Sequence, residues 1–190
     1  MNKNLRVPYG LSVHGGEEIR AVTEVLKSST QMGKNVSIFE KKISKLFDKK
    51  YGLMVNSGSS ALLLAMETLD FPAGSEIITP ALTFSTTVGY IVRNNWVPVF
   101  VDVEEGTYCI NEDKIKNLIT KKTKAVVAPH LMGNIVNWDK VAPVLKKKGI
   151  LIIEDSADTL GATYKKKSTG HHADISITSF YGSHIINCAG

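Results

Sequence analysis

Residues 151–158 read Leu-Ile-Ile-Glu-Asp-Ser-Ala-Asp, an apolar run that passes directly into carboxylates. Short apolar runs bounded by polar residues are typical of strands that are buried on both faces of a sheet. A buried carboxylate at the end of such a strand needs a cation or hydrogen bonds. Asp155 could therefore belong to a helix N-cap, bind a metal, or pair with a protonated ring nitrogen, and the local sequence leaves these readings open.

Comparable apolar runs occur on both sides of this stretch, and helix-like segments separate them. The predicted strands are 51–55, 77–79, 97–101, 125–128, 151–153 and 175–178, and the predicted helices are 16–27, 36–47, 60–69, 86–94, 112–119 and 139–147. Strands that alternate with helices predict an α/β fold, with a mainly parallel sheet flanked by helices. Ligands in such sheets bind outside the carboxyl ends of the strands.

A serine-rich segment, residues 56–60, joins a predicted strand to a predicted helix. Gly58 allows a close approach of the backbone to a ligand, and Ser59 and Ser60 present hydroxyl and N–H groups at a helix N-terminus. This arrangement favours a bound anion such as a phosphate. An ordinary helix cap would account for one of the serines equally well.

Two further side chains follow predicted strands. Phe84 could lie flat against a heteroaromatic ring, or it could belong to the core. His130 could line a ligand cavity, but a structural role is the favoured interpretation of a lone histidine.

The closing segment, residues 179–190, reads Ser-Phe-Tyr-Gly-Ser-His-Ile-Ile-Asn-Cys-Ala-Gly. Together with the segments described above and in the same order, it resembles the DegT/DnrJ/EryC1/StrS family of sugar aminotransferases, from near Gly33 to the last residue. The resemblance implies the large domain of the fold type I enzymes that use pyridoxal 5'-phosphate (PLP), in truncated form. It also implies an arm and helix at 1–35, a cofactor-binding domain at 36–190, and an absent small C-terminal domain.

The resemblance also implies roles for individual residues. Ser59, Ser60 and Ser179 would bind the cofactor phosphate, Phe84 would stack on the ring, and Asp155 would pair with the ring nitrogen. A lysine in this family holds the cofactor covalently, but here that position is His184, and no lysine follows Lys167.

A histidine at this position is typical of one branch of the family, whose members remove the C3 hydroxyl from nucleotide-linked 4-keto-6-deoxy sugars. The resemblance therefore implies a non-covalent cofactor, PLP or pyridoxamine 5'-phosphate (PMP), with His184 as the proton carrier. An imidazole can serve first as a base and then as an acid near neutral pH. Ala157 stands where iron–sulfur members of the branch have a cysteine, which argues against a cluster.

Two alternatives stay open: an aminotransferase of the same family whose lysine lies elsewhere, and a non-catalytic fragment that binds a ligand or partner. The family resemblance further implies a homodimer acting on a nucleotide-linked keto sugar in deoxysugar biosynthesis for a surface polysaccharide.

The composition narrows the function classes. The 190 residues are 43% apolar and 22% charged, which is ordinary for a globular protein, and the net charge of +5 is mild. The clustered lysines lack interleaved aromatics, so we expect solvated faces and no nucleic-acid binding. The two cysteines form no CxxC pair, and no signal peptide or membrane span is visible, so we expect no zinc site and a cytoplasmic location.

Overall fold

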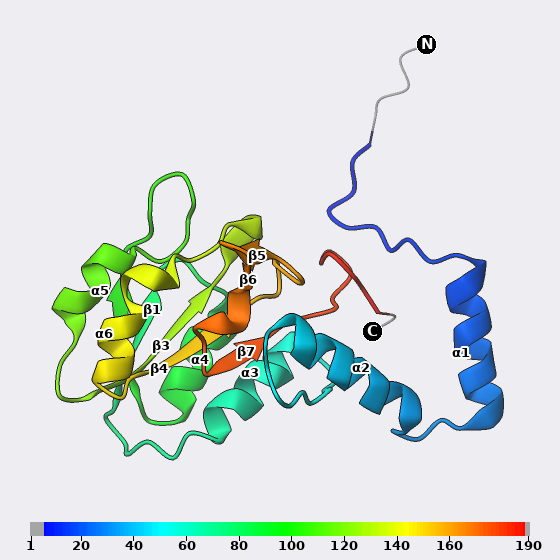
Figure 1. Ribbon diagram of the computed structural model, residues 1–190, viewed down its shortest axis with the longest axis horizontal. Coiled ribbons are helices and arrows are strands. Elements are labelled where there is room, and N and C mark those ends of the chain that lie inside the picture. The colour runs from blue at the N-terminus through cyan, green and yellow to red at the C-terminus, as the bar shows by residue number, and fades with distance from the viewer. Residues whose placement is uncertain (1–5, 189–190) are drawn as a thin grey trace, which may run out of the picture.

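The computed structural model describes residues 6–188, so the first residues of the predicted arm and Ala189-Gly190 of the closing segment lie outside it. The core is one parallel sheet with the strand order β2-β1-β3-β4-β7 (Figure 1). Its strands are β1 (Glu76–Pro80), β2 (Val97–Val101), β3 (Thr123–Pro129), β4 (Leu151–Asp155) and β7 (Ile175–Ile177). All four strand pairings are parallel, so the carboxyl ends of the strands share one edge of the sheet.

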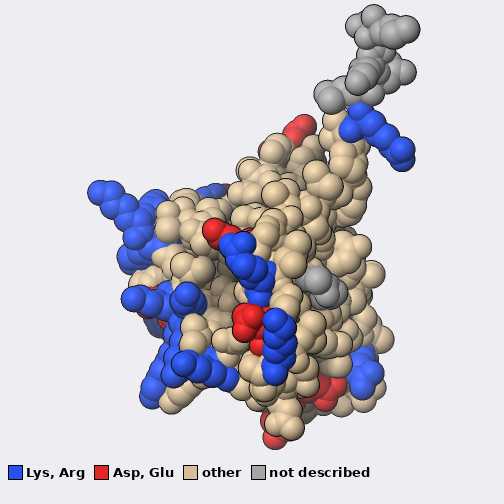
Figure 2. Space-filling model, turned by 90° about the vertical axis from the view of Figure 1, so that its right-hand side faces the viewer, with Lys and Arg blue, Asp and Glu red and all other residues tan. Residues whose placement is uncertain are grey.

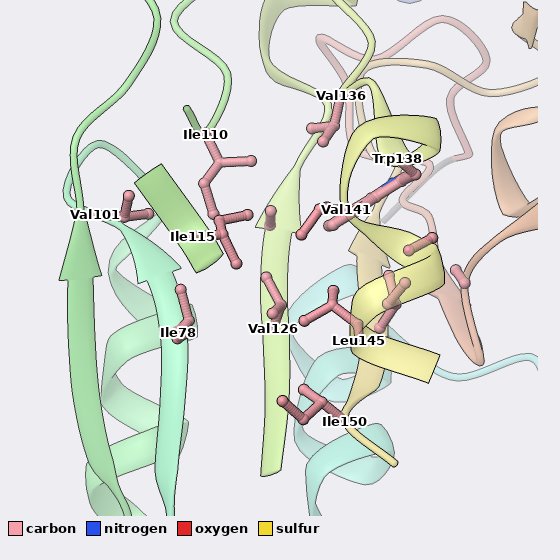
Figure 3. Close-up of a cluster of buried hydrophobic side chains, with 14 of the residues drawn as sticks. Ile78, Val101, Ile110, Ile115, Val126, Val136, Trp138, Val141, Leu145 and Ile150 are labelled. Atoms are coloured by element: carbon pink, nitrogen blue, oxygen red, sulfur yellow. The ribbon is translucent and has the colours of Figure 1, made fainter. Parts of the chain in front are cut away.

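Helices cover both faces of the sheet. The helices α3 (Gly58–Glu67) and α4 (Ser85–Arg93) pack on one face, and α5 (Glu112–Leu118), η2 (Trp138–Lys140) and α6 (Ala142–Lys147) pack on the other. Successive strand residues point to opposite faces of the sheet. Ile77 packs in the hydrophobic cluster under α3 and α4, and Ile78 packs in the cluster under α5 and α6, which Figure 3 shows. The expected α/β class with a parallel sheet is therefore confirmed.

Two local predictions were wrong, and one small element was not predicted. Residues 51–55 form no strand; this run is irregular, and the Met54 N–H donates to Glu40 Oε1 at 2.8 Å. The predicted helix at 139–147 is broken at Val141, because Pro143 has no N–H for a continuous helix and instead sits in the first turn of α6. The small antiparallel pair β5 (Thr163–Tyr164) and β6 (Lys167–Ser168) was not predicted, since each strand has only two residues.

The N-terminal part projects away from the sheet (Figure 1). It contains α1 (Gly16–Ser28) and α2 (Lys34–Leu46), which match the predicted helices within two residues at each end. No residue of α1 is buried, and its apolar side chains Ile19, Val22 and Leu26 are 58–67% exposed. In the view of Figure 2, Lys and Arg gather along the left margin, and further basic and acidic side chains lie near the middle of the face. Within residues 6–188, no helix has the length and apolar character needed to cross a bilayer.

The remaining short helices lie in loops that follow strands: η1 (Leu131–Gly133) comes after β3, and η3 (Thr169–His171) comes after β6.

Candidate active site

Asp155 is the last residue of β4, at the carboxyl edge of the sheet. Its Oδ1 accepts a hydrogen bond from the Ala157 N–H at 3.0 Å. Burial raises the pKa of the Asp155 carboxyl; the hydrogen bond from Ala157 lowers it, nearby Asp158 raises it again, and the net shift is upward. Asp155 forms no ion pair with any residue in the range 6–188, so this carboxylate lacks the cation that would stabilise its charge.

His184 lies in the segment that follows β7, close to Asp158 in the loop after β4. Its Nε2 is 3.9 Å from Asp158 Oδ1, and its ring meets the Tyr181 ring edge-on, with 5.9 Å between centroids. The His184 side chain is only 18% exposed, and its Nδ1 is buried without a hydrogen-bond partner in the described part of the chain. Sequence reasoning singled out His184 but missed Asp158 and Tyr181 as its neighbours.

The N-terminus of α3 lies against the segment after β7. Ser57 is the N-cap, and its Oγ accepts from the Ser60 N–H at 3.0 Å, so the cap interpretation holds for this serine. A Cβ added to Gly58 would lie only 2.8 Å from Ser179 Cβ. Gly58 therefore permits the close approach of Ser179, and the structure brings Ser59, Ser60 and Ser179 to one place.

Phe84 immediately precedes α4 and follows β1 by four residues, so it also lies past a carboxyl end. Its side chain is 65% exposed. The alternative that Phe84 belongs to the core is therefore wrong, and its ring is free to contact a ligand.

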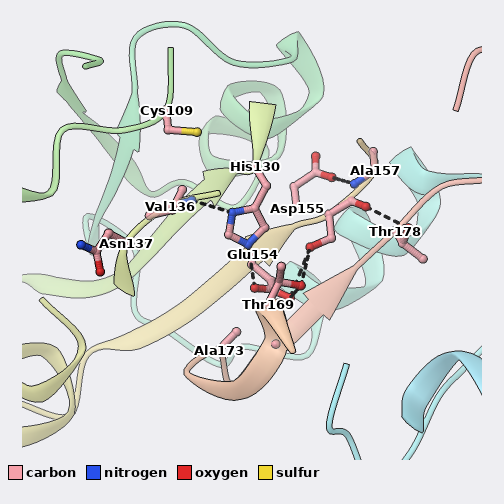
Figure 4. Close-up of polar contacts among 12 residues, drawn as sticks. Cys109, His130, Val136, Asn137, Glu154, Asp155, Ala157, Thr169, Ala173 and Thr178 are labelled. Carbon is pink, nitrogen blue, oxygen red and sulfur yellow. Dashed lines mark hydrogen bonds and ion pairs between the residues drawn. The ribbon is translucent and has the colours of Figure 1, made fainter. Parts of the chain in front are cut away.

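His130 belongs to a buried polar network behind Asp155 (Figure 4). Its Nδ1 accepts from the Val136 N–H, and its Nε2 lies 3.0 Å from Glu154 Oε2. Since Nδ1 is an acceptor, Nε2 carries the proton and donates to Glu154. The other Glu154 oxygen accepts from Ser156 and Thr169 at 3.3 and 3.4 Å. Both nitrogens of His130 are thus satisfied, which confirms its structural role.

Lys49 approaches the same network from the end of α2. Its Nζ donates to the carbonyl of Gly170 at 2.7 Å and to that of Ala173. Burial lowers the pKa of Lys49, while the charge of Glu154 opposes that shift. No local pattern signals this contact, because 121 residues separate Lys49 from Gly170.

A metal is not supported as the partner of Asp155. Among residues 6–188, no three His, Cys, Asp or Glu side chains are grouped so that they could hold an ion. For the helix-cap alternative, the one contact is the hydrogen bond from the Ala157 N–H to Asp155 Oδ1. Asp155 Oδ2 accepts no hydrogen bond from the described residues.

Known proteins resemble this chain in sequence and in fold. The chain is 36% identical over 187 residues to the dTDP-4-dehydro-2,6-dideoxy-D-glucose 3-dehydratase of Saccharopolyspora spinosa, covering 94% of this chain and 40% of that protein. The structure of Escherichia coli GDP-4-keto-6-deoxy-D-mannose-3-dehydratase with bound hydrated PLP superimposes with a TM-score of 0.88 at 31% identity, over 96% of this chain and 49% of that one.

An aminotransferase matches equally well. The Helicobacter pylori aminotransferase of pseudoaminic acid biosynthesis gives a TM-score of 0.88 at 30% identity, over 96% of this chain and 50% of that one. The chain spans less than half the length of the curated relatives it matches. Its fold is that of PLP-dependent sugar aminotransferases and dehydratases, as the sequence predicted.

These similarities extend over almost the whole chain and do not depend on the closing segment alone. The model of the DegT/DnrJ/EryC1/StrS aminotransferase family matches residues 13–190. The chain therefore belongs to the DegT/DnrJ/EryC1/StrS aminotransferase family.

Proposed function

We propose that this chain forms the cofactor-binding part of a PMP-dependent enzyme that removes the C3 hydroxyl from a nucleotide-linked 4-keto-6-deoxy sugar. The observation that carries the proposal is His184, a partly buried imidazole where the family's aminotransferases are expected to have a lysine. An imidazole moves protons near neutral pH but cannot hold the cofactor covalently, as a lysine amine does.

The residues present fit the cofactor. Asp155 is a carboxylate with a raised pKa and no cation of its own, which suits a protonated pyridine nitrogen. The N-terminus of α3, with Ser59, Ser60 and the adjacent Ser179, suits a phosphate. The exposed ring of Phe84 suits stacking. When bound, the cofactor would supply an electron sink for breaking the bond at C3.

The surroundings of His184 suit the handling of a proton. Asp158 Oδ1, at 3.9 Å from Nε2, would stabilise the positive charge of a protonated imidazole. The His184 Nδ1 is buried and has no hydrogen-bond partner within residues 6–188, so no described protein group competes for the proton that the imidazole would carry. Tyr181 packs against the ring and limits its rotation.

Amino transfer is the second candidate function, because matched relatives include an aminotransferase and perosamine synthases. It would require a lysine at the site, and the chain has none after Lys167. A third candidate is a chain that binds ligand without catalysis. Assembly as a homodimer and a cytoplasmic location belong to the proposal as expectations for the complete enzyme.

The first test uses covalent trapping. The chain is incubated with PLP, reduced with borohydride and digested, and the peptide covering residues 168–190 is weighed. The parent should show no pyridoxyl adduct in this peptide, whereas His184→Lys should gain one. Cys188→Lys, an exposed position four residues away, is the matched control and should react far less. Equal labelling of the two lysine variants would mean that residue 184 does not face the cofactor.

The second test concerns the reaction in the complete enzyme. His184→Asn should keep cofactor binding and lose at least about 100-fold in the rate of C3 deoxygenation, because acid–base groups typically contribute that much or more. Exchange of solvent deuterium into the cofactor should fall in parallel. An Asn variant that deoxygenates as fast as the parent would refute the proposal.

A further inference from the structure

A second cavity lies away from the proposed cofactor site. It has a volume of about 110 Å³ and is enclosed by the β5–β6 hairpin, by η3 and by the loop that runs through η2. We call it the hairpin pocket; its lining includes Trp138, Tyr164, Lys165, Lys167, Ser168 and His171. None of its lining residues is among the six residues proposed for the cofactor and the proton. A volume of this size holds several waters and is large enough for a small ion.

Two polar atoms in the wall of the hairpin pocket lack partners. Trp138 is 2% exposed, and its indole Nε1 has no acceptor within the described residues. Ser168, on β6, also lines the pocket, and its Oγ is buried without a partner among the described residues. A buried N–H without an acceptor costs roughly 1–3 kcal/mol, so buried donors of this kind are normally satisfied by a bound molecule. Both atoms can donate, and an indole can only donate.

The charges around the hairpin pocket point to an anion. Lys165 forms an ion pair with Asp139 at 2.7 Å, and His172 contacts the other oxygen of that carboxylate at 2.6 Å. Lys167 has no carboxylate partner among residues 6–188; its Nζ instead lies 3.0 Å from His171 Nε2. An ammonium has three donors, and this contact uses one. The pocket therefore presents an uncompensated positive charge beside two unsatisfied donors.

An open basic hollow elsewhere on the molecule provides a comparison. It is lined by Lys121, Lys124 and Lys148, but none of its lining residues has a buried polar atom without a partner. Those lysines are ordinary solvated side chains. Of these two hollows, the hairpin pocket is the one that combines positive charge with residues whose buried polar atoms lack a partner among the described residues.

We infer that the hairpin pocket is a binding site for a small oxyanion, a phosphate or carboxylate group, held by Lys167, the Trp138 indole and the Ser168 hydroxyl. This site does not depend on the proposed enzymatic function, because it uses none of the same residues. A charged donor together with neutral N–H and O–H groups is the usual way in which proteins bind such groups.

The indole N–H of Trp138 can report binding directly by NMR. The chain has two tryptophans, and the other one, Trp96, already donates from Nε1 to the Phe71 carbonyl at 3.1 Å. The ¹⁵N-labelled chain is titrated with sodium phosphate and, separately, with sodium acetate at constant ionic strength. The variant Trp96→Phe assigns the two indole signals. We expect the Trp138 signal to shift downfield and to saturate, while the Trp96 signal stays in place and reports an intact fold.

Matched variants then test which lysine is responsible. Lys167→Met should weaken binding roughly tenfold, since a charged hydrogen bond is lost. Lys166→Met, at the tip of the same hairpin but outside the pocket lining, should bind as the parent does. Saturation with phosphate alone identifies a phosphate site, and saturation with acetate alone identifies a carboxylate site. If neither anion gives a saturable shift, or if Lys166→Met loses as much as Lys167→Met, the proposed site does not exist.

Discussion

Replacing Gly58 by Ala tests the contact that assembles the serines of the proposed phosphate site. Gly58 is the first residue of α3 and does not have a positive φ, so its backbone can accept an alanine. The new Cβ would lie 2.8 Å from Ser179 Cβ and 3.1 Å from Ser179 Oγ. Carbon atoms in contact normally stay about 3.5–4.0 Å apart, so either Ser179 or the helix must move by roughly 1 Å.

The expected loss follows from two opposing effects. Overpacking of this kind costs typically about 1–3 kcal/mol, whereas replacing Gly by Ala in a helix contributes up to about 1 kcal/mol. The Gly58→Ala chain should therefore be less stable than the parent by roughly 1–2 kcal/mol. Gly89→Ala is the matched control, because Gly89 lies in α4 and nothing would meet its Cβ within 4 Å. The control should be more stable than the parent by about 0.5–1 kcal/mol.

Urea and thermal unfolding of the two variants provide the measurement. For a chain of this size, a difference of about 2 kcal/mol separates the melting temperatures by roughly 4–8 °C. The double variant Gly58→Ala with Ser179→Gly removes the atom that clashes, so it should recover at least about 1 kcal/mol relative to the sum of the single changes. The displacement of Ser179 should also weaken the binding of PLP, whereas Gly89→Ala should leave binding unchanged.

The reasoning fails if Gly58→Ala melts as high as Gly89→Ala, because the close approach of Ser179 would then be absent. It also fails if Ser179→Gly does not relieve the loss. In that case the cost would come from the backbone of α3 and would say nothing of the phosphate site.

Two further changes test the charges around this site. Burial raises the pKa of Asp155 above its ordinary value of 3.8, so the folded chain holds the carboxyl proton more tightly than the unfolded chain does. The free energy of unfolding therefore falls as the pH rises from 3.8 through the raised pKa of the folded chain. Asp155→Asn should therefore have a higher urea midpoint than the parent at pH 7 and lose that advantage towards pH 4; a lower midpoint at pH 7 would contradict the assignment. Lys49→Met leaves the carbonyls of Gly170 and Ala173 without their donor, so it should cost roughly 1–3 kcal/mol and speed amide exchange in 169–173. The exposed neighbour supplies the control, Lys50→Met, and an equal loss in both variants would show that the buried contact is not responsible.

Short-range sequence patterns were sufficient for the framework of this fold. Five of the six apolar runs are strands. Of these, β1, β3 and β4 are buried at most positions, which is why their sequences are almost continuously apolar. The run at 51–55 is also largely apolar, but it pairs with no strand among the described residues. A strand needs a hydrogen-bonding partner, and its own sequence cannot supply one.

The amino-acid sequence by itself determined which chemical groups are available: a histidine in place of a lysine at residue 184, a carboxylate at the end of β4, and serines at the start of a helix. These features are local and can be read in chain order. Only the tertiary structure decided which groups meet, such as His130 with Glu154, Gly58 with Ser179, and Trp138 with the β5–β6 hairpin. Those contacts join residues 24 to 121 positions apart, and they depend on how the strands are ordered and how the loops close over the sheet. Burial and polar atoms without partners, on which the proposals for His184 and for the anion pocket depend, therefore arise only when the chain is folded.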